Sequence, residues 1–365
     1  MNAFQLSEWL PSFLLPFFTL SYPTDAPVRP DSFHDSPYYN TGLLDGCIIV
    51  TCIAVMAVLR DISRIYIMEP FAKWKLTRDW KRSKTHLPNG TTNGAANGVT
   101  NGTANGNGHS VYTNGKDPHM PPKQARKIHR SVLRFAEQGW SAIYYTVQWS
   151  FGLYVHINLP TSALHPTELW LDYPHIPLPG PLKFYYLTQT AFYLHQVLIL
   201  NAEARRKDHY QMMTHHVITI ILMVASYFYN FTRVGCLIMV LMDWCDIFLP
   251  VAKMLRYIKL YTLCDAMFTW FLLSWFVTRH VFFIIVIKSA IMDAPRLIRV
   301  GWSPEFGAYY SEFTHFLFEM MLVALQIIQF IWFWMICRVA WRVVSGKGAA
   351  DERSDDESDS NKKDE

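Results

Sequence analysis

The sequence has few charged residues and no cysteine pattern that could stabilise a small extracellular domain. Only 17% of its 365 residues are Asp, Glu, Lys or Arg, whereas 51% are hydrophobic and 15% are aromatic. The six cysteines form no Cys-x-x-Cys pair and lie in or beside apolar runs, where cysteine is usually a small buried hydrophobic residue. These features exclude a disulfide-rich secreted module, a fibrous chain and an ordinary cytosolic enzyme.

The N-terminus also lacks the basic segment that begins a secretory signal peptide. Its short apolar stretch, FLLPFFTLSYP, contains prolines. We therefore expect residues 1–42 to form a luminal N-terminal segment and not a cleaved leader.

What the sequence does contain is a series of apolar runs long enough to cross a membrane. A helix of about 20 apolar residues spans a hydrocarbon core of roughly 30 Å. Seven stretches fit: residues 43–62, 140–159, 184–201, 214–231, 234–252, 264–288 and 314–338. They are too long and too uniformly apolar for barrel strands. The sequence therefore predicts an all-α polytopic membrane protein, a bundle of about seven transmembrane helices; an eighth, N-terminal crossing is the alternative.

Lys and Arg are concentrated in the segments expected on one side of the membrane. Residues 60–134 contain 14 of them, and the loops at 202–213 and 252–262 contain three each. Because cytosolic loops are enriched in Lys and Arg, this distribution predicts a luminal N-terminus and a cytosolic C-terminus.

Two polar stretches interrupt this pattern and are predicted to be disordered. The first is an Asn-Gly repeat from Asn89 to Gly108, which has no side chains able to build a core. The second is the tail from Asp351, which carries a net charge of −5 and leaves +9 for residues 1–350. Ser354 in this tail precedes three acidic residues, which suits an acid-directed kinase; a solvated tail with no regulatory role is the alternative.

These features divide the chain into five parts. We expect a luminal segment at 1–42, a first transmembrane helix at 43–67, a cytosolic loop with the linker at 68–122, a domain of six transmembrane helices at 123–342, and an acidic cytosolic tail at 343–365.

Four ionisable residues in the apolar runs are the candidates for chemistry, because charges inside a membrane are costly and are usually functional. They are His215 and His216 in the fourth run and Asp243 and Asp246 in the fifth. The short connection between these runs predicts an antiparallel hairpin that brings Asp246 within about 4.5 Å, along the axis, of His216. A histidine oriented by a carboxylate can act as a general base or as a nucleophile.

Further polar residues extend this candidate site. Thr219, Ser226 and Asn230 continue a polar stripe along the fourth run, and Lys253 does so on the fifth. Five basic residues would form a rim at the cytosolic mouth that suits a polyphosphate-bearing donor: Arg205, Arg206, Lys207, Lys253 and Arg256. The apolar helices around the site suit an acyl chain. The pattern therefore favours a lipid acyltransferase that uses a cytosolic thioester.

Two other interpretations of the four residues remain open at this point. They could form a structural polar network between helices, or two histidines and two aspartates could bind zinc or iron. The chain lacks the several His-rich boxes of a di-iron hydroxylase. We expect no metal.

The segment from Arg205 to Tyr257 resembles the Lag1 motif of ceramide synthases, within the TLC-domain family. The matching features are the RRKD lead-in, the adjacent histidines followed by Thr219, the NFTRVG turn, the Asp-x-x-Asp pair and the closing Lys253. Similarity in arrangement extends from about Lys123 to Arg342, and the acidic tail looks like that of fungal members. Many animal members have His where this chain has Met242, and their homeobox-like insert is absent here.

The resemblance implies that a fatty acyl-CoA N-acylates a sphingoid base to give ceramide or dihydroceramide. It implies an endoplasmic reticulum membrane protein with acyl-CoA as co-substrate and no bound cofactor. It also carries catalytic importance onto His215, His216, Asp243 and Asp246, and polar support onto Arg279 and His280. Membrane lipid, and a small membrane subunit or a second copy of the chain, are compatible partners; no nucleic acid is expected. The alternative is a TLC-type protein that binds or senses lipid without catalysis.

Overall fold

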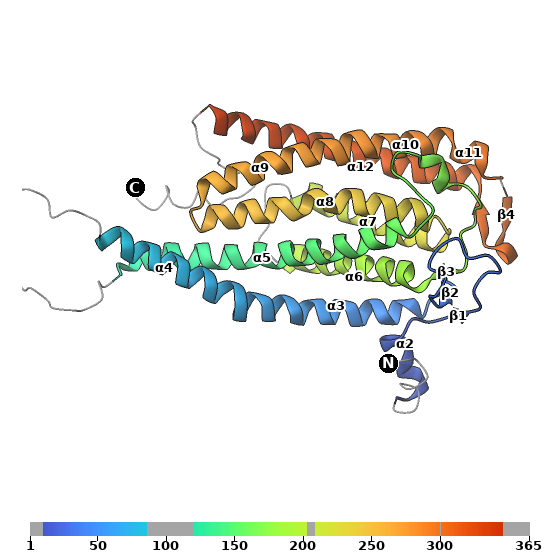
Figure 1. The fold of residues 1–365 in the computed structure, drawn as a ribbon, viewed down its shortest axis with the longest axis horizontal. Coiled ribbons are helices and arrows are strands. Elements are labelled where there is room, and N and C mark those ends of the chain that lie inside the picture. Colours follow the sequence, from blue (N-terminus) through green and yellow to red (C-terminus); the bar gives the residue numbers. More distant parts are fainter. Residues whose placement is uncertain (1–9, 86–119, 203–208, 300, 346–365) are drawn as a thin grey trace, which may run out of the picture.

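The computed structural model describes residues 10–85, 120–202, 209–299 and 301–345, and the structural statements below refer to these ranges. In them the chain forms a bundle of long helices that run side by side, with short strands and loops gathered at one end (Figure 1). The predicted all-α fold is confirmed.

The described residues form seven helical rods, two of which contain a π-helical turn. In chain order they are α3 (Asp45–Ile62) continued by η2 (Ser63–Met68) and α4 (Glu69–Thr85); α5 (Pro122–Ile157); α6 (Gly180–Ala202); α7 (His209–Phe228); α8 (Thr232–Tyr257); α9 (Tyr261–Trp275) continued by η4 (Phe276–Phe282), α10 (Phe283–Met292) and α11 (Ala294–Leu297); and α12 (Glu312–Val344). The π-helical turns are η2 and η4. Residues 69–85, which the sequence placed in a loop, instead continue the first rod.

Five of these rods are long and apolar enough to cross a membrane: Asp45–Lys84, His209–Phe228, Thr232–Tyr257, Tyr261–Leu297 and Glu312–Val344. For the other two predicted spans, residues 140–159 and 184–201, the structure shows the helices α5 and α6, which do not meet that standard. The expectation of about seven spans is thus confirmed for five segments only.

The end of the bundle that carries the N-terminal segment is closed by short elements. The helical turns are η1 (Ser12–Leu14), α2 (Leu15–Phe18), η3 (Pro166–Leu169) and η5 (Pro304–Phe306). The antiparallel strands β1 (Pro23–Thr24), β2 (Tyr38–Tyr39) and β3 (Leu178–Pro179) form one small sheet, and β4 (Gly301–Ser303) pairs with β5 (Ala308–Tyr310). We call this the strand end and the opposite one the α4 end.

One buried ion pair and the hydrogen bonds around it fasten the N-terminal segment to the strand end. Lys183 at the start of α6 is fully buried, and its Nζ lies 2.7 Å from the Asp45 Oδ1 atom of α3. The same ammonium donates to the backbone oxygens of Ser21 and Asn40 at 2.8 Å each, and the Tyr227 hydroxyl donates to Asp45 Oδ2 at 2.7 Å. A buried charge is tolerated only when it is paired and hydrogen-bonded, as Lys183 is here.

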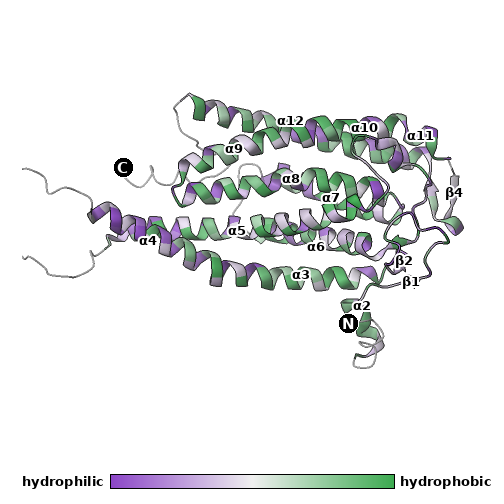
Figure 2. Cartoon of the chain, viewed as in Figure 1, coloured by the Kyte–Doolittle hydropathy of each residue, from purple (hydrophilic) through white to green (hydrophobic). Residues whose placement is uncertain are grey.

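Helix α8 lies at the centre of the bundle, packed mainly against α5 and α9. Its buried residues are apolar for most of its length, including Leu237, Val240 and Leu241. Large apolar side chains elsewhere point outward, such as Val50, Val58 and Ile331. Figure 2 shows hydrophobic residues along the helices and a hydrophilic concentration on α4. An apolar exterior is what a lipid-facing bundle requires.

Three parts of the sequence analysis lie outside the described residues. They are the Asn-Gly linker, the basic residues Arg205, Arg206 and Lys207, and the acidic tail with Ser354.

Candidate active site

A cavity inside the bundle contains one of the two predicted histidines. The empty space within it and at its mouth, open solvent included, amounts to about 1000 Å³. Its walls come from α6, α7, α8, η4, α10, α12 and the loops at the strand end. Apolar side chains such as Leu222, Ile238 and Leu325 form most of its surface. We call this space the central cavity.

His215 lines the central cavity, in the second turn of α7. Its ring lies 5.1 Å from the Trp332 ring of α12 and meets it edge to face. The Nδ1 atom is buried and has no hydrogen-bond partner among the described residues. The side chain therefore has a fixed position and an unused nitrogen next to an apolar cavity.

His216 is directed towards α6 and not into the central cavity. It is buried, it is not among the residues that line the cavity, and its ring packs edge to face on Tyr193 of α6 at 5.8 Å. The two histidine rings are 5.5 Å apart. Adjacent residues on a helix point about 100° apart, which explains why only one of the pair reaches the cavity.

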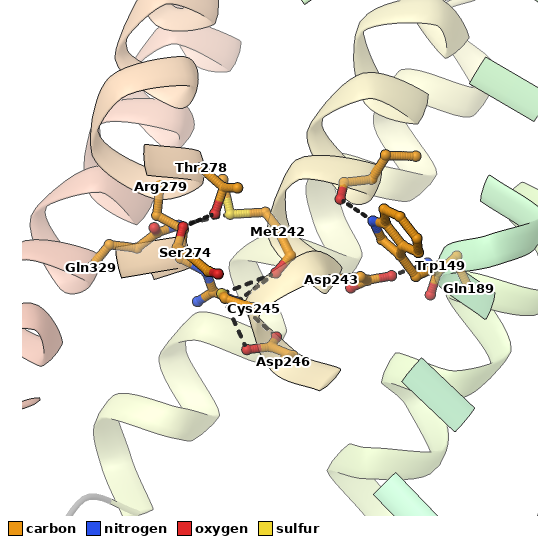
Figure 3. A network of polar contacts seen from close by, with 11 residues as sticks. Trp149, Gln189, Met242, Asp243, Cys245, Asp246, Ser274, Thr278, Arg279 and Gln329 are labelled. Atoms are coloured by element: carbon orange, nitrogen blue, oxygen red, sulfur yellow. Dashed lines mark hydrogen bonds and ion pairs between the residues drawn. The ribbon is translucent and has the colours of Figure 1, made fainter. Parts of the chain in front are cut away.

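Asp246 is paired with a cation from the sixth rod. Its Oδ2 atom lies 2.7 Å from Arg279 Nη2, and the same nitrogen donates to the Met242 backbone oxygen at 2.8 Å (Figure 3). The guanidinium also lies over the Trp275 ring at 4.0 Å. Arg279 is 4% exposed and lines the central cavity, and its Nε atom has no partner among the described residues.

Asp243 lies one turn away and contacts a different helix. It is fully buried and accepts a hydrogen bond from Gln189 Nε2 of α6. Gln189 is in turn held by the hydroxyls of Tyr185 and Tyr144, at 3.2 and 3.1 Å. Figure 3 shows Asp243 directed towards Gln189 and Asp246 towards Arg279. The two carboxylates thus belong to two separate networks.

The expectation that Asp246 orients a histidine is therefore wrong in this structure. Among the described residues neither carboxylate forms a hydrogen bond or ion pair with His215 or His216. The expected hairpin of α7 and α8 does form, with only residues 229–231 between the helices. The spacing along the hairpin does not determine how α8 is rotated about its own axis. In the structure this rotation turns Asp243 towards α6 and Asp246 towards η4.

The other predicted support residues fall into two groups. Thr219 and Ser226 line the central cavity with His215, as the polar stripe predicted. Asn230 lies outside the cavity, in a turn with φ of 62°, and donates to the Gly307 backbone oxygen at 2.8 Å. His280 is also outside it: its Nδ1 atom lies 2.9 Å from Gln326 Nε2, and its ring stacks on Phe330. Asn230 and His280 therefore support the helix packing and do not line the cavity.

The two described residues of the predicted basic rim lie near the end of α8. Lys253 and Arg256 are half-buried and come about two and three turns after Asp246, at the α4 end of the bundle. Neither lines the central cavity.

Several residues of the site were not expected from the sequence. Trp275 packs on Arg279 and Trp332 packs on His215, and the two tryptophan rings are 6.4 Å apart. Gln329 of α12 lines the cavity and donates to the Met242 sulfur at 3.1 Å. The signal that could have indicated Gln329, as well as Gln189, is an amide side chain within an apolar run, because such groups seek partners on other helices.

The metal-binding alternative finds no support in the described part of the chain. No three His, Cys, Asp or Glu side chains come together there in a way that could hold a metal ion. The ion pair of Asp246 with Arg279 also uses a carboxylate that a metal would need.

The arrangement can perform acyl chemistry at the point where the polar and apolar parts of the cavity meet. His215 offers a ring nitrogen as base or nucleophile. Arg279 offers an N–H donor to an oxygen that becomes negative during acyl transfer, and a donor aimed at developing charge is the usual form of such stabilisation. The apolar remainder of the cavity can hold a hydrocarbon chain.

Comparison with known proteins places the chain in a family. The profile of the TLC domain matches residues 134–338, more than half of the chain. Curated relatives include Ceramide Synthase FUM18 of Gibberella moniliformis, 38% identical over 256 residues, which is 63% of this chain and 60% of that protein. Sphingosine N-acyltransferase lag1 of Schizosaccharomyces pombe is 39% identical over 228 residues, 62% of this chain and 58% of that one.

A nematode protein, Ceramide synthase hyl-1 of Caenorhabditis elegans, is 36% identical over 222 residues, which is 59% of each chain. The matched region thus spans about three fifths of the length of these relatives. It includes every element that lines the central cavity. This chain belongs to the TLC-domain family.

Proposed function

We propose that this protein is a ceramide synthase, which N-acylates a sphingoid base with a fatty acyl-CoA. The observation that carries the proposal is the position of His215, a histidine with an unused nitrogen in the wall of an apolar cavity, beside a paired arginine. The names of the curated relatives support the same reaction.

In the proposed reaction, the sphingoid amine becomes bonded to the acyl carbon and the bond between that carbon and the thioester sulfur breaks. In the direct route His215 removes a proton from the attacking amine and returns one to the departing thiolate. In the covalent route a ring nitrogen of His215 displaces the thiol first, and the amine then displaces the imidazole. Both routes release one amide and one CoA thiol.

The remaining residues have supporting roles in this proposal. Arg279 donates to the carbonyl oxygen as it gains negative charge. Asp246 holds the guanidinium in place through the 2.7 Å ion pair and offsets its charge within the membrane. Asp243 has an indirect, positioning role, because its hydrogen bond with Gln189 holds α8 against α6. Thr219 offers a hydroxyl for a substrate amine or hydroxyl.

We place the cavity entrance for the thioester at the cytosolic side of the endoplasmic reticulum membrane, with the C-terminus cytosolic. The α4 end carries the basic residues of α4 and, at the end of α8, Lys253 and Arg256. Clusters of Lys and Arg are typical of cytosolic segments and suit the phosphates of CoA. The co-substrate supplies the acyl group, so the proposal needs no bound cofactor.

The first test is synthesis by the purified protein. Supplied with sphinganine and a fatty acyl-CoA in detergent micelles, it should form dihydroceramide, measured by mass spectrometry. His215→Ala should lower kcat by about 10²- to 10⁴-fold, the usual contribution of a general base. His156→Gln is the matched control, since His156 lies near the end of α5, does not line the cavity and contacts Thr161; it should retain activity within a few-fold.

Two results would decide against parts of the proposal. If the wild-type protein makes no amide even after membrane partners are added back, the enzyme proposal fails and a lipid-binding role remains. If turnover occurs but incubation with acyl-CoA alone never gives an acyl adduct on intact protein, the direct route stands and the covalent route is excluded.

A further inference from the structure

The polar groups of the central cavity are gathered at its two ends. At the end nearest the reactive histidine, four residues present polar atoms that have no partner among the described residues: His215, Thr219, Arg279 and Gln329. Polar residues in the middle of the wall are satisfied within the protein. Tyr186 donates to the Thr232 backbone oxygen at 3.1 Å, and Ser226 donates to the Met223 backbone oxygen at 3.0 Å.

A second set of polar groups lines the far end of the cavity, where the chain passes from β5 into α12. It consists of Tyr310, His315 and Glu319, which we call the distal polar cluster. The Tyr310 and His315 rings are 5.4 Å apart, and His315 Nε2 lies 3.1 Å from Glu319 Oε1. On α12 the spacing from His315 to Gln329 corresponds to about 21 Å. The two polar ends are therefore separated by the length of a long extended hydrocarbon chain.

The hydroxyl of Tyr310 is the unsatisfied polar group of this cluster. Its side chain is 2% exposed, and the hydroxyl has no hydrogen-bond partner among the described residues. Burial, and then the nearby Glu319 carboxylate, raise the pKa of Tyr310 to about 12, so the hydroxyl keeps its proton and can donate it. An unpaired buried hydroxyl destabilises the protein, and a ligand that accepts its hydrogen bond would remove that cost.

The neighbouring groups define which ligand atom fits. His315 Nε2 donates to the Ala290 backbone oxygen at 2.9 Å and lies 3.1 Å from Glu319 Oε1. The ion-pair contact with His315 involves only one Glu319 oxygen, so the other can serve as an acceptor. A hydroxyl can both accept from Tyr310 and donate to Glu319. A terminal methyl would leave both unpaired, and a terminal carboxylate would be repelled by Glu319.

We propose that the central cavity binds an acyl chain with a hydroxyl group at its remote end, which accepts a hydrogen bond from Tyr310 and donates one to Glu319. This inference rests on the proposed N-acyltransferase function, because the acyl thioester must lie at His215 for the remote end to reach Tyr310. It adds a preference for ω-hydroxyacyl chains to that reaction.

The test compares two thioesters of equal length, ω-hydroxyhexadecanoyl-CoA and hexadecanoyl-CoA, with sphinganine as acceptor. Wild-type protein should favour the hydroxylated thioester in kcat/KM. Tyr310→Phe removes only the unpaired hydroxyl and should reduce that preference about fivefold, the worth of one hydrogen bond of ~1 kcal/mol. Glu319→Gln should reduce it as well. Tyr309→Phe, at the neighbouring position of β5 and outside the cavity wall, is the matched control and should keep the wild-type preference.

A second measurement needs no turnover and separates this inference from the proposed function. Saturating ω-hydroxyhexadecanoic acid should raise the melting temperature of the wild-type protein more than hexadecanoic acid does, and Tyr310→Phe should abolish the difference. Absence of amide product from both thioesters, with this difference in melting temperature intact, would defeat the enzyme proposal alone. Equal preferences and equal melting temperatures in wild type and Tyr310→Phe would overturn the distal site and mean that the cluster holds only water.

Discussion

At the scale of single residues, the site depends on how one buried cation is held. Arg279 lies in a membrane-spanning rod and makes three contacts that fit a planar guanidinium: the Asp246 carboxylate, the Met242 backbone oxygen and the face of Trp275. A lysine could not form this combination, because its ammonium is a point charge without a planar face. The arginine therefore keeps a fixed orientation beside His215 while its charge is offset by Asp246.

This arrangement predicts that the Asp246–Arg279 pair affects stability and activity in different ways. Asp246→Asn leaves the buried guanidinium uncompensated and should destabilise the protein by about 3–5 kcal/mol, as should Arg279→Gln. The double variant Asp246→Asn/Arg279→Gln contains no unpaired charge, so its melting temperature should lie above that of either single variant. Its kcat should nevertheless remain at least about 100-fold below wild type, because the donor to the carbonyl oxygen is lost.

Thermal unfolding in detergent and steady-state kinetics on the same four proteins check this. If the double variant recovered both stability and activity, Arg279 would be only a packing element. If its melting temperature were no higher than that of either single variant, the two residues would not be energetically coupled.

The sequence singled out the candidate residues but not their partners. His215 and the two aspartates stood out because charges within apolar runs are rare. The pairing of Asp246 with Arg279 was not predictable from spacing alone, because it joins residues from two helices whose relative rotation depends on packing. Arg279 itself lies in the π-helical turn η4, and such turns occur frequently at functional sites without a marked sequence signal.

At the scale of helices, the contact of α8 with α6 depends on a glycine. A Cβ atom at Gly235 would lie 1.7 Å from the Tyr186 hydroxyl oxygen and 3.1 Å from Ser226 Oγ. Real Cβ atoms do not approach other atoms this closely, so the helices must separate or Tyr186 must move if the position carries a side chain. Because Tyr186, Ser226 and Gly235 all line the central cavity, the same contact sets the shape of its wall.

Gly235→Ala should therefore destabilise the protein by about 1–3 kcal/mol, the usual cost of overpacking. Removing the hydroxyl in Gly235→Ala/Tyr186→Phe should recover part of that loss, since the nearest atom in the way is the phenolic oxygen. The control is Gly46→Ala in α3, where a Cβ would meet no atom within 4 Å; it should be neutral or slightly stabilising. Thermal melts of the four proteins in detergent measure this, and a Gly235→Ala protein as stable as Gly46→Ala would contradict it.

Helix positions were the most predictable feature at this scale. Each of the seven apolar runs overlaps a helix, because a run of that length in lipid has no other way to satisfy its backbone. The helix ends were less predictable: α5 begins at Pro122, well before the apolar run at 140–159, because charged residues can extend a helix beyond the membrane. The small sheet at the strand end could not be foreseen, since its two-residue strands come from distant parts of the chain and have no periodicity.

At the scale of the whole molecule, charge is distributed unequally between the two ends of the bundle. At the strand end the side chains of Lys183 and Arg233 are buried and pair with Asp45 and Asp31. The other described basic residues there are exposed: Arg29, Lys288, Arg296 and Arg299. The α4 end carries basic side chains that face outward, among them Lys73 and Arg78. Because basic residues near the membrane surface bias orientation, the larger number of Lys and Arg at the α4 end favours the same orientation as the sequence count.

This asymmetry predicts which end of the protein reaches the cytosol. Lys73→Cys places a thiol on the exposed side of α4, and Phe306→Cys places one at a 73% exposed position of η5 at the strand end. In sealed microsomes a membrane-impermeant maleimide should label Lys73→Cys at once, and should label Phe306→Cys only after detergent is added. The wild-type protein, with its six native cysteines, supplies the background. Labelling in the reverse order would show the opposite topology, with the basic end on the side without acyl-CoA. Labelling of both variants before detergent is added would show that the two ends do not lie on opposite sides of the membrane.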